Sequence, residues 1–122
     1  MLETSITLDS DAIKRRLAKT TYIFNAESPD FTANHEHNVF FIQMYQNYFN
    51  DLLIARGYVF LNEVLTKIGL KPTMIGQLAG WRKDASGYIE IKIEQTMMSG
   101  LDVKEYFLKI EHDGLIFDVL GD

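Results

Sequence analysis

The chain has 122 residues, of which 47% are apolar and 12% aromatic, so it does not have the composition of a disordered protein. Its 12 basic and 17 acidic side chains give a net charge of −5, which argues against a protein that coats DNA without sequence preference. Cysteine is absent, and this excludes disulfides, thiolate catalysis, cysteine-ligated zinc and iron–sulfur clusters together. The length fits a single domain over residues 1–122.

Neither an export signal nor a membrane span is predicted. Residues 1–10 have no basic cluster and no apolar run. The longest apolar stretches, such as residues 39–42, hold four residues, whereas a membrane span needs about 20. We therefore expect a soluble protein without membrane association.

The first helix is predicted to follow Asp9 and Ser10, either of which is a suitable N-cap. Its apolar side would contain Ala12, Ile13, Leu17 and, at its far end, Ile23. A second helix start is predicted at residues 28–30, where serine, proline and aspartate occur in the order typical of a first turn. A later start near Asn38 stays open, because residues 34–38 form helix poorly.

The segment from Val39 to Arg56 has the clearest helical pattern. Large apolar side chains recur at three- and four-residue spacing, and Gly57 stands at the usual position after a helix. The members of this pattern are Phe41, Tyr45, Tyr48, Phe49 and Leu52. The apolar stripe is wider than that of a simple surface helix, because it also includes Phe40, Met44 and Leu53.

Two shorter helical segments follow. Residues 61–68 have apolar side chains at helical spacing, and Gly69 is placed to end them. A further short helix is predicted over residues 72–79, with Gly80 at its end. Gly76 in the middle of this helix costs about 1 kcal/mol relative to alanine, which indicates that another segment approaches its backbone closely.

In the last third of the chain the apolar period changes from helical to alternating. Residues 89–93 and 106–110 alternate apolar and polar side chains, which predicts two strands, each with one buried face. The Asp113-Gly114 pair predicts a type I′ hairpin turn into a third strand over residues 115–119, and residues 96–102 would form a longer connection. The predicted fold is α+β, with N-terminal helices packed on a C-terminal three-stranded antiparallel meander.

The histidines are the first candidates for a metal site. His35 and His37 stand one residue apart, with Glu27 and Asp30 upstream and His112 as a conceivable third ligand. Two imidazoles at this spacing point to the same side in an extended segment but diverge by about 200° on a helix. Histidines in polar loops are more often bystanders, so we expect neither a metal nor any other cofactor.

The residue patterns typical of enzymes are missing from the sequence. The chain has no G-x-S-x-G motif and no cysteine nucleophile. Glu90 and Glu94 lie on one strand face opposite lysines, which predicts cross-strand ion pairs rather than a general acid. Residues 76–80 contain two glycines but lack the lysine of a phosphate-binding loop. We therefore expect no enzymatic activity.

Two sets of side chains are candidates for binding another molecule. The first is a surplus of aromatic rings beyond what one thin meander needs for its core, which is typical of a protein interface: Phe40, Phe41, Tyr45, Tyr48, Tyr58 and Trp81. The alternative, that all of these rings are core residues, stays open. The second is a basic set suited to phosphate contacts: Lys14, Arg15, Arg16, Lys19, Arg82 and Lys83.

Residues 56–81 carry a specific motif. An aromatic residue is followed by L-N-E, then by a glycine, a threonine and G-x-x-x-G-W. The matching residues are Tyr58, Leu61, Asn62, Glu63, Val64, Ile68, Gly69, Leu70, Thr73, Gly76, Gly80 and Trp81. The segment resembles a widespread, uncharacterised family of phage and prophage proteins, and the similarity covers residues 56–94. The resemblance implies a viral genomic context and brings no assigned activity.

We therefore expect a non-enzymatic protein-interaction or assembly component of phage type, either a small virion structural protein or an accessory factor. Its partner would be a second copy of itself, as a homo-oligomer, or another phage protein. Its place would be the cytoplasm of the bacterial host or the virion. The alternative is a nucleic-acid-associated regulator that uses the basic set.

Overall fold

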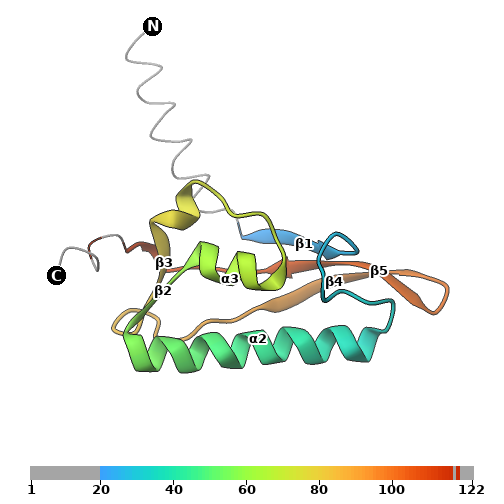
Figure 1. Ribbon diagram of the computed structural model, residues 1–122, viewed down its shortest axis with the longest axis horizontal. Coiled ribbons are helices and arrows are strands. Elements are labelled where there is room, and N and C mark those ends of the chain that lie inside the picture. Colours follow the sequence, from blue (N-terminus) through green and yellow to red (C-terminus); the bar gives the residue numbers. More distant parts are fainter. Residues whose placement is uncertain (1–19, 117, 119–122) are drawn as a thin grey trace, which may run out of the picture.

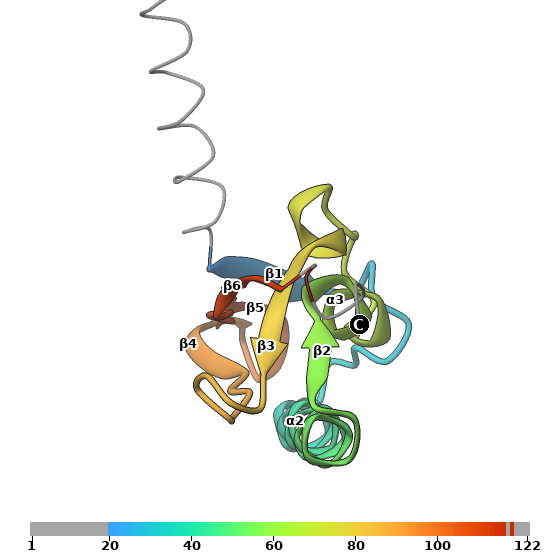
Figure 2. The same cartoon turned by 90° about the vertical axis from the view of Figure 1, so that its left-hand side faces the viewer.

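The computed structural model describes residues 20–116 and residue 118. Within them the chain forms two α-helices and six strands, and the strands make two antiparallel sheets in the orders β1-β5-β4 and β2-β3-β6. Figures 1 and 2 show both helices on one face of the sheet β1-β5-β4, while the smaller sheet lies at the end where α2 stops. The α+β class is confirmed, but the helices are not all N-terminal and the sheet is not a single meander.

The first strand, β1 (Thr21–Asn25), occupies the place where the first predicted helix was expected to end. Tyr22 and Phe24 are buried, whereas Ile23 points outward between them. This alternation is that of a strand, so the assignment of Ile23 to a helix is wrong. The remainder of that predicted helix lies outside the described residues.

Helix α2 (His35–Arg56) begins at neither of the two predicted starts. Asn34 caps it, because its side-chain oxygen accepts a hydrogen bond of 2.9 Å from the backbone N–H of His37. The Ser28 hydroxyl is not used as a cap, since it is buried and donates a hydrogen bond of 3.1 Å to the Gly69 carbonyl. The end of α2 is as predicted, with Gly57 at a φ of 96°.

After α2 come β2 (Tyr58–Phe60) and helix α3 (Leu61–Ile68), which matches its prediction. The helix predicted over residues 72–79 is reduced to a 3₁₀ turn, Ile75–Gln77, and Gly80 belongs to β3 (Ala79–Arg82). Gly80 pairs with Phe60 of β2, and a Cβ atom at position 80 would collide with the Val59 carbonyl oxygen. Close strand pairing therefore explains this glycine better than a helix end does.

Strands β4 (Lys92–Ser99) and β5 (Asp102–Lys109) form a long hairpin around a two-residue turn, so the longer connection predicted for residues 96–102 is wrong. Gly100 in this turn has a φ of 65°, which the first position of a type II′ turn requires. β1 pairs with β5 along the edge opposite β4.

The last strand, β6 (Gly114–Leu115), pairs with β3 instead of folding back on β5, so the predicted Asp113-Gly114 hairpin is wrong. The backbone N–H of Asp113 donates a 2.7 Å hydrogen bond to the Gly80 carbonyl, and this bond draws the chain toward β3. Trp81 is fully buried at the junction, where its indole N–H donates to the Glu111 carbonyl at 2.9 Å.

Candidate protein interface on helix α2

Helix α2 has an inner face in the core and an outer face with an apolar row. Asn38, Ile42, Tyr45, Phe49 and Leu53 form its buried side. On the outer side, Phe40, Met44 and Tyr48 recur at every fourth position and are 57%, 46% and 51% exposed. Residues four apart lie one above the other on a helix, so these three side chains, here called the α2 row, form one continuous strip.

Aromatic rings and a lysine line the flank of the α2 row that faces α3. The Phe41 ring lies 6.3 Å from that of Phe40 and stacks with the imidazole of His37 at 4.9 Å. The ammonium group of Lys67, on α3, lies 5.2 Å from the centre of the Tyr48 ring, within the range of a cation–π contact. These contacts hold the rings in place before any partner binds, which lowers the entropy cost of association.

The structure separates the six predicted interface residues into three groups. Phe40 and Tyr48 are exposed, and Phe41 and Tyr58 are half-buried. Tyr45 and Trp81 are core residues and cannot offer a surface. Tyr45 donates a hydrogen bond from its hydroxyl to the Asp30 carboxylate, and burial together with this acid raises the pKa of the phenol. Met44 was absent from the predicted set, although its four-residue spacing from both Phe40 and Tyr48 was a usable signal.

The L-N-E part of the sequence motif connects segments of the fold. The Glu63 carboxylate accepts a 2.8 Å hydrogen bond from the Phe60 backbone N–H and pairs with the Arg56 guanidinium at 2.6 Å. Asn62 makes two hydrogen bonds of 2.8 Å to the backbone N–H and carbonyl of Thr73. A Cβ atom at Gly76 would collide with the Asn62 amide, so this glycine lets the 3₁₀ turn approach α3.

A family model described as a family of unknown function, DUF6353, matches residues 3–113. The chain belongs to this family. No curated protein and no solved structure shows significant similarity to it. In this DUF6353 protein the matched region includes both helices, the α2 row and the whole of the L-N-E motif.

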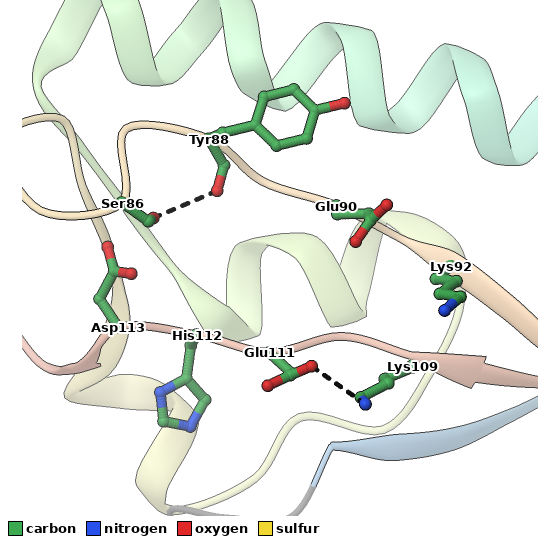
Figure 3. Close-up of a pocket in the computed structure, with 8 residues that line it drawn as sticks. All are labelled: Ser86, Tyr88, Glu90, Lys92, Lys109, Glu111, His112 and Asp113. Carbon is green, nitrogen blue, oxygen red and sulfur yellow. Dashed lines mark hydrogen bonds and ion pairs between the residues drawn. The ribbon is translucent and has the colours of Figure 1, made fainter.

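A polar pocket of about 390 Å³ opens in the DUF6353 protein where β4 and β5 separate beyond their last pair, Lys92 and Lys109. Figure 3 shows its lining: Ser86, Tyr88, Glu90, Lys92, Lys109, Glu111, His112 and Asp113. The Lys109 ammonium lies 3.2 Å from Glu111 and 3.8 Å from Glu94, and these acids raise the pKa of the lysine. The predicted ion pair of Glu94 with a lysine is therefore present.

The polar groups of this pocket are largely engaged with the protein itself. The Ser86 hydroxyl donates to the Tyr88 carbonyl at 3.3 Å, and the Asp113 carboxylate accepts from the Arg82 backbone N–H at 3.0 Å. His112 Nδ1 accepts a 2.9 Å hydrogen bond from the backbone N–H of Gly114. These side chains of mixed charge bond to each other and to the backbone, and so they stabilise the local fold. The pocket therefore has no cluster of like charges that would attract a ligand of the opposite charge.

The three histidines lie at two different ends of the protein. His35 is hydrogen-bonded through Nδ1 to the Tyr106 hydroxyl at 2.9 Å, and His37 points elsewhere, onto Phe41. Both belong to the first turn of α2, where a two-residue spacing makes side chains diverge, and His112 lies beyond β5. Between residues 20 and 118, excluding residue 117, no group of three or more histidine, aspartate or glutamate side chains is placed to hold a metal ion.

Of the basic set, residues 14, 15, 16 and 19 lie outside the described residues. Arg82 pairs with Asp84 at 3.1 Å and with Asp118 at 2.7 Å, and these acids raise the pKa of its guanidinium. Lys83 donates to the Ile54 carbonyl at 3.3 Å. The charge of Arg82 is therefore balanced by two acids, whereas the bond of Lys83 to a neutral carbonyl leaves its positive charge in place. The described helices include none long and apolar enough to cross a membrane.

Proposed function

We propose that the chain is a non-enzymatic protein-interaction component of phage type, a small virion structural protein or an accessory factor, which binds another protein through the α2 row. The observation that carries this proposal is the row itself: three large apolar side chains, each about half exposed, on one strip of a 22-residue helix. Exposed aromatic and methionine side chains in a contiguous strip are typical of interface cores.

Another exposed apolar group, at the tip of the β4–β5 hairpin, fits an interface less well. Leu101 is 96% exposed there, and Met97 and Met98 are exposed beside it. Met97 lies opposite Glu105 in the strand register, and Asp102 follows the turn directly. Charged residues lie within this hairpin group, whereas residues 39–50 of α2, which contain the whole row, include no charged residue.

The sequence motif supports a structural and not a catalytic role for the segment that resembles phage proteins. The polar side chains at positions 62, 63 and 73 form hydrogen bonds with backbone groups of neighbouring segments, and Gly76 and Gly80 let two segments pack closely together. The motif therefore stabilises the part of the fold that packs against α2. The resemblance of residues 56–94 to phage and prophage proteins supports the viral context.

Site-specific photocrosslinking tests the proposal. A benzophenone amino acid placed at Phe40 or Tyr48 is expected to form adducts with another protein. The experiment uses cells that express the chain together with the other proteins encoded by the same genome. The same group at Lys104, which is exposed on β5, is the control. Protein adducts no more abundant from positions 40 and 48 than from position 104 would contradict the proposal. Mass spectrometry of purified particles then separates a virion part, present in them, from an accessory factor.

A further inference from the structure

We propose that the segment before β1 folds back and covers the second face of the sheet β1-β5-β4, the face away from the helices. The sequence predicts a helix in this segment after Ser10, with Ile13 and Leu17 four residues apart on its apolar side. Residues 1–19 lie outside the described part of the chain. Four observations point to this arrangement: the apolar centre of the face, the place where the chain enters the sheet, the charges on both sides and the extent of the family match.

The sheet β1-β5-β4 has one face under the helices and an open face, which no described helix or strand covers (Figures 1 and 2). The strand register places Ile23, Phe107 and Gln95 side by side in the middle of the open face, and Met97 lies in the next row. Ile23 is 49% and Met97 40% exposed, while Phe107 is half-buried. A sheet face that stays in water is normally polar, so large apolar side chains at its centre indicate that another layer packs there.

The described chain begins beside this open face. The Thr20 carbonyl accepts a 2.7 Å hydrogen bond from the backbone N–H of Ile110, whose neighbour in the chain is Glu111. The chain therefore enters the sheet next to the pocket that Glu111 and Lys109 line (Figure 3). A helix over residues 10–19 is about 15 Å long, whereas the three strands span about 10 Å from β1 to β4. The segment is therefore long enough to cross the whole face.

The charges of the segment and of the open face are complementary. Residues 10–19 carry four basic side chains and one acidic side chain. The charged side chains around Lys109 and along the open face include more acids than bases: Lys92, Lys109, Glu90, Glu94, Glu105 and Glu111. Lys109 pairs with Glu94 and Glu111, whereas Glu90 and Glu105 form no ion pair within the described residues. The basic residues of the segment supply these carboxylates with partners of opposite charge.

The family match and the covalent connection favour the chain's own segment over a separate protein. The DUF6353 model matches from residue 3, so the segment belongs to the same family region as the sheet. Because the segment is joined directly to β1, its effective concentration at the face is roughly millimolar, and a small apolar contact is enough to hold it there. A separate protein would instead need an interface of about 1,000 Å² or more.

Crosslinking between two introduced cysteines tests the contact in the full chain, because the native chain contains no cysteine. In Ile13→Cys/Gln95→Cys, a short bismaleimide at low micromolar protein is expected to join the two positions within one chain. The matched control is Ile13→Cys/Asn47→Cys, because Asn47 is exposed on α2, on the other side of the sheet. Peptide mass spectrometry should detect several-fold less crosslink in this control.

Oxidation of methionine by peroxide gives a second measurement, which does not depend on how the segment is oriented. Met97 on the open face and Met44 on α2 have similar exposed fractions in the described structure, 40% and 46%. If the segment covers the face, Met97 should oxidise several-fold more slowly than Met44 in the native chain. Ile13→Asp/Leu17→Asp should raise the Met97 rate to that of Met44, while an unchanged Met44 rate and circular dichroism spectrum show that the fold is kept.

The outcomes separate the possible occupants of the face. A crosslink within one chain, together with slow oxidation of Met97 that Ile13→Asp/Leu17→Asp removes, supports the proposal. A crosslink that joins positions 13 and 95 of two different chains would show that copies exchange the segment, and would overturn it. Slow oxidation of Met97 that persists in the aspartate variant would assign the cover to another molecule. Equal rates for Met97 and Met44 in the native chain, with no crosslink above the control, would show that the face is open.

Discussion

Replacing Asn62 by alanine tests whether the L-N-E motif supports the fold, as its contacts indicate. The Asn62 amide donates to the Thr73 carbonyl and accepts from the Thr73 backbone N–H, both at 2.8 Å. The Thr73 hydroxyl in turn accepts from the Gly76 N–H at 2.9 Å, so the substitution removes both hydrogen bonds by which Asn62 holds the start of the 3₁₀ turn against α3.

The expected loss follows from the two hydrogen bonds. Each contributes about 1 kcal/mol net, and the two backbone groups of Thr73 left behind are half-buried and regain water only in part. Alanine forms helix better than asparagine and returns about 0.5 kcal/mol near the start of α3. The free energy of unfolding should therefore fall by about 1.5 kcal/mol, which lowers the melting temperature by roughly 6 °C for a domain of this length.

Urea titration and a thermal scan of Asn62→Ala measure this loss directly. Asn47→Ala is the control, because the exposed Asn47 side chain makes no hydrogen bond within the described residues, and its effect should stay within about 0.5 kcal/mol. A folded Asn62→Ala protein should still crosslink through the α2 row. An unfolding free energy equal to that of the native chain, combined with lost binding, would show that the motif serves recognition instead.

Three further outcomes are expected. Burial and the bond to Asp30 raise the pKa of Tyr45, so the folded state keeps this phenol protonated. The free energy of unfolding should therefore fall as the pH rises above about 10, because only the unfolded state loses the proton there. Urea titrations of Tyr45→Phe should show a smaller fall over the same pH range. Replacing both Phe40 and Tyr48 by serine should abolish the proposed protein association in co-purification and lower the free energy of unfolding by about 3 kcal/mol, because about half of each ring is buried. Gly100→Ala should cost about 1 kcal/mol of stability, because its φ of 65° strains alanine.

The helices were predictable where local signals and tertiary packing agree. Gly57 and Gly69 end α2 and α3 at positive φ, as their place after an apolar pattern indicated. The start of α2 was less predictable, because Ser28 had the better capping sequence. Its hydroxyl is bonded to Gly69, a partner 41 residues away that local reasoning does not reveal.

Strand partners were the part that the sequence did not determine. Ile89 and Ile91 are buried, as their alternation indicated, but their backbone N–H groups donate to the side chains of Asn50 and Gln46 on α2, so β4 begins only at Lys92. Alternating apolar and polar side chains predict which face of a strand is buried, but they do not predict which segment pairs with that strand. For the same reason the aromatic surplus was visible in the sequence, whereas its division into core and α2 row was not.

The edges of the larger sheet make strand addition an unfavourable alternative to the proposed binding through the α2 row. β4 forms one edge, and it carries Lys92, Glu94 and two register irregularities, features that discourage an added strand. β1 at the opposite edge faces residues 70–73 across an opening of about 290 Å³, so a neighbouring segment already lies beside it. Serine at positions 40 and 48 should remove the proposed binding through the α2 row but should leave a complex formed by strand addition intact.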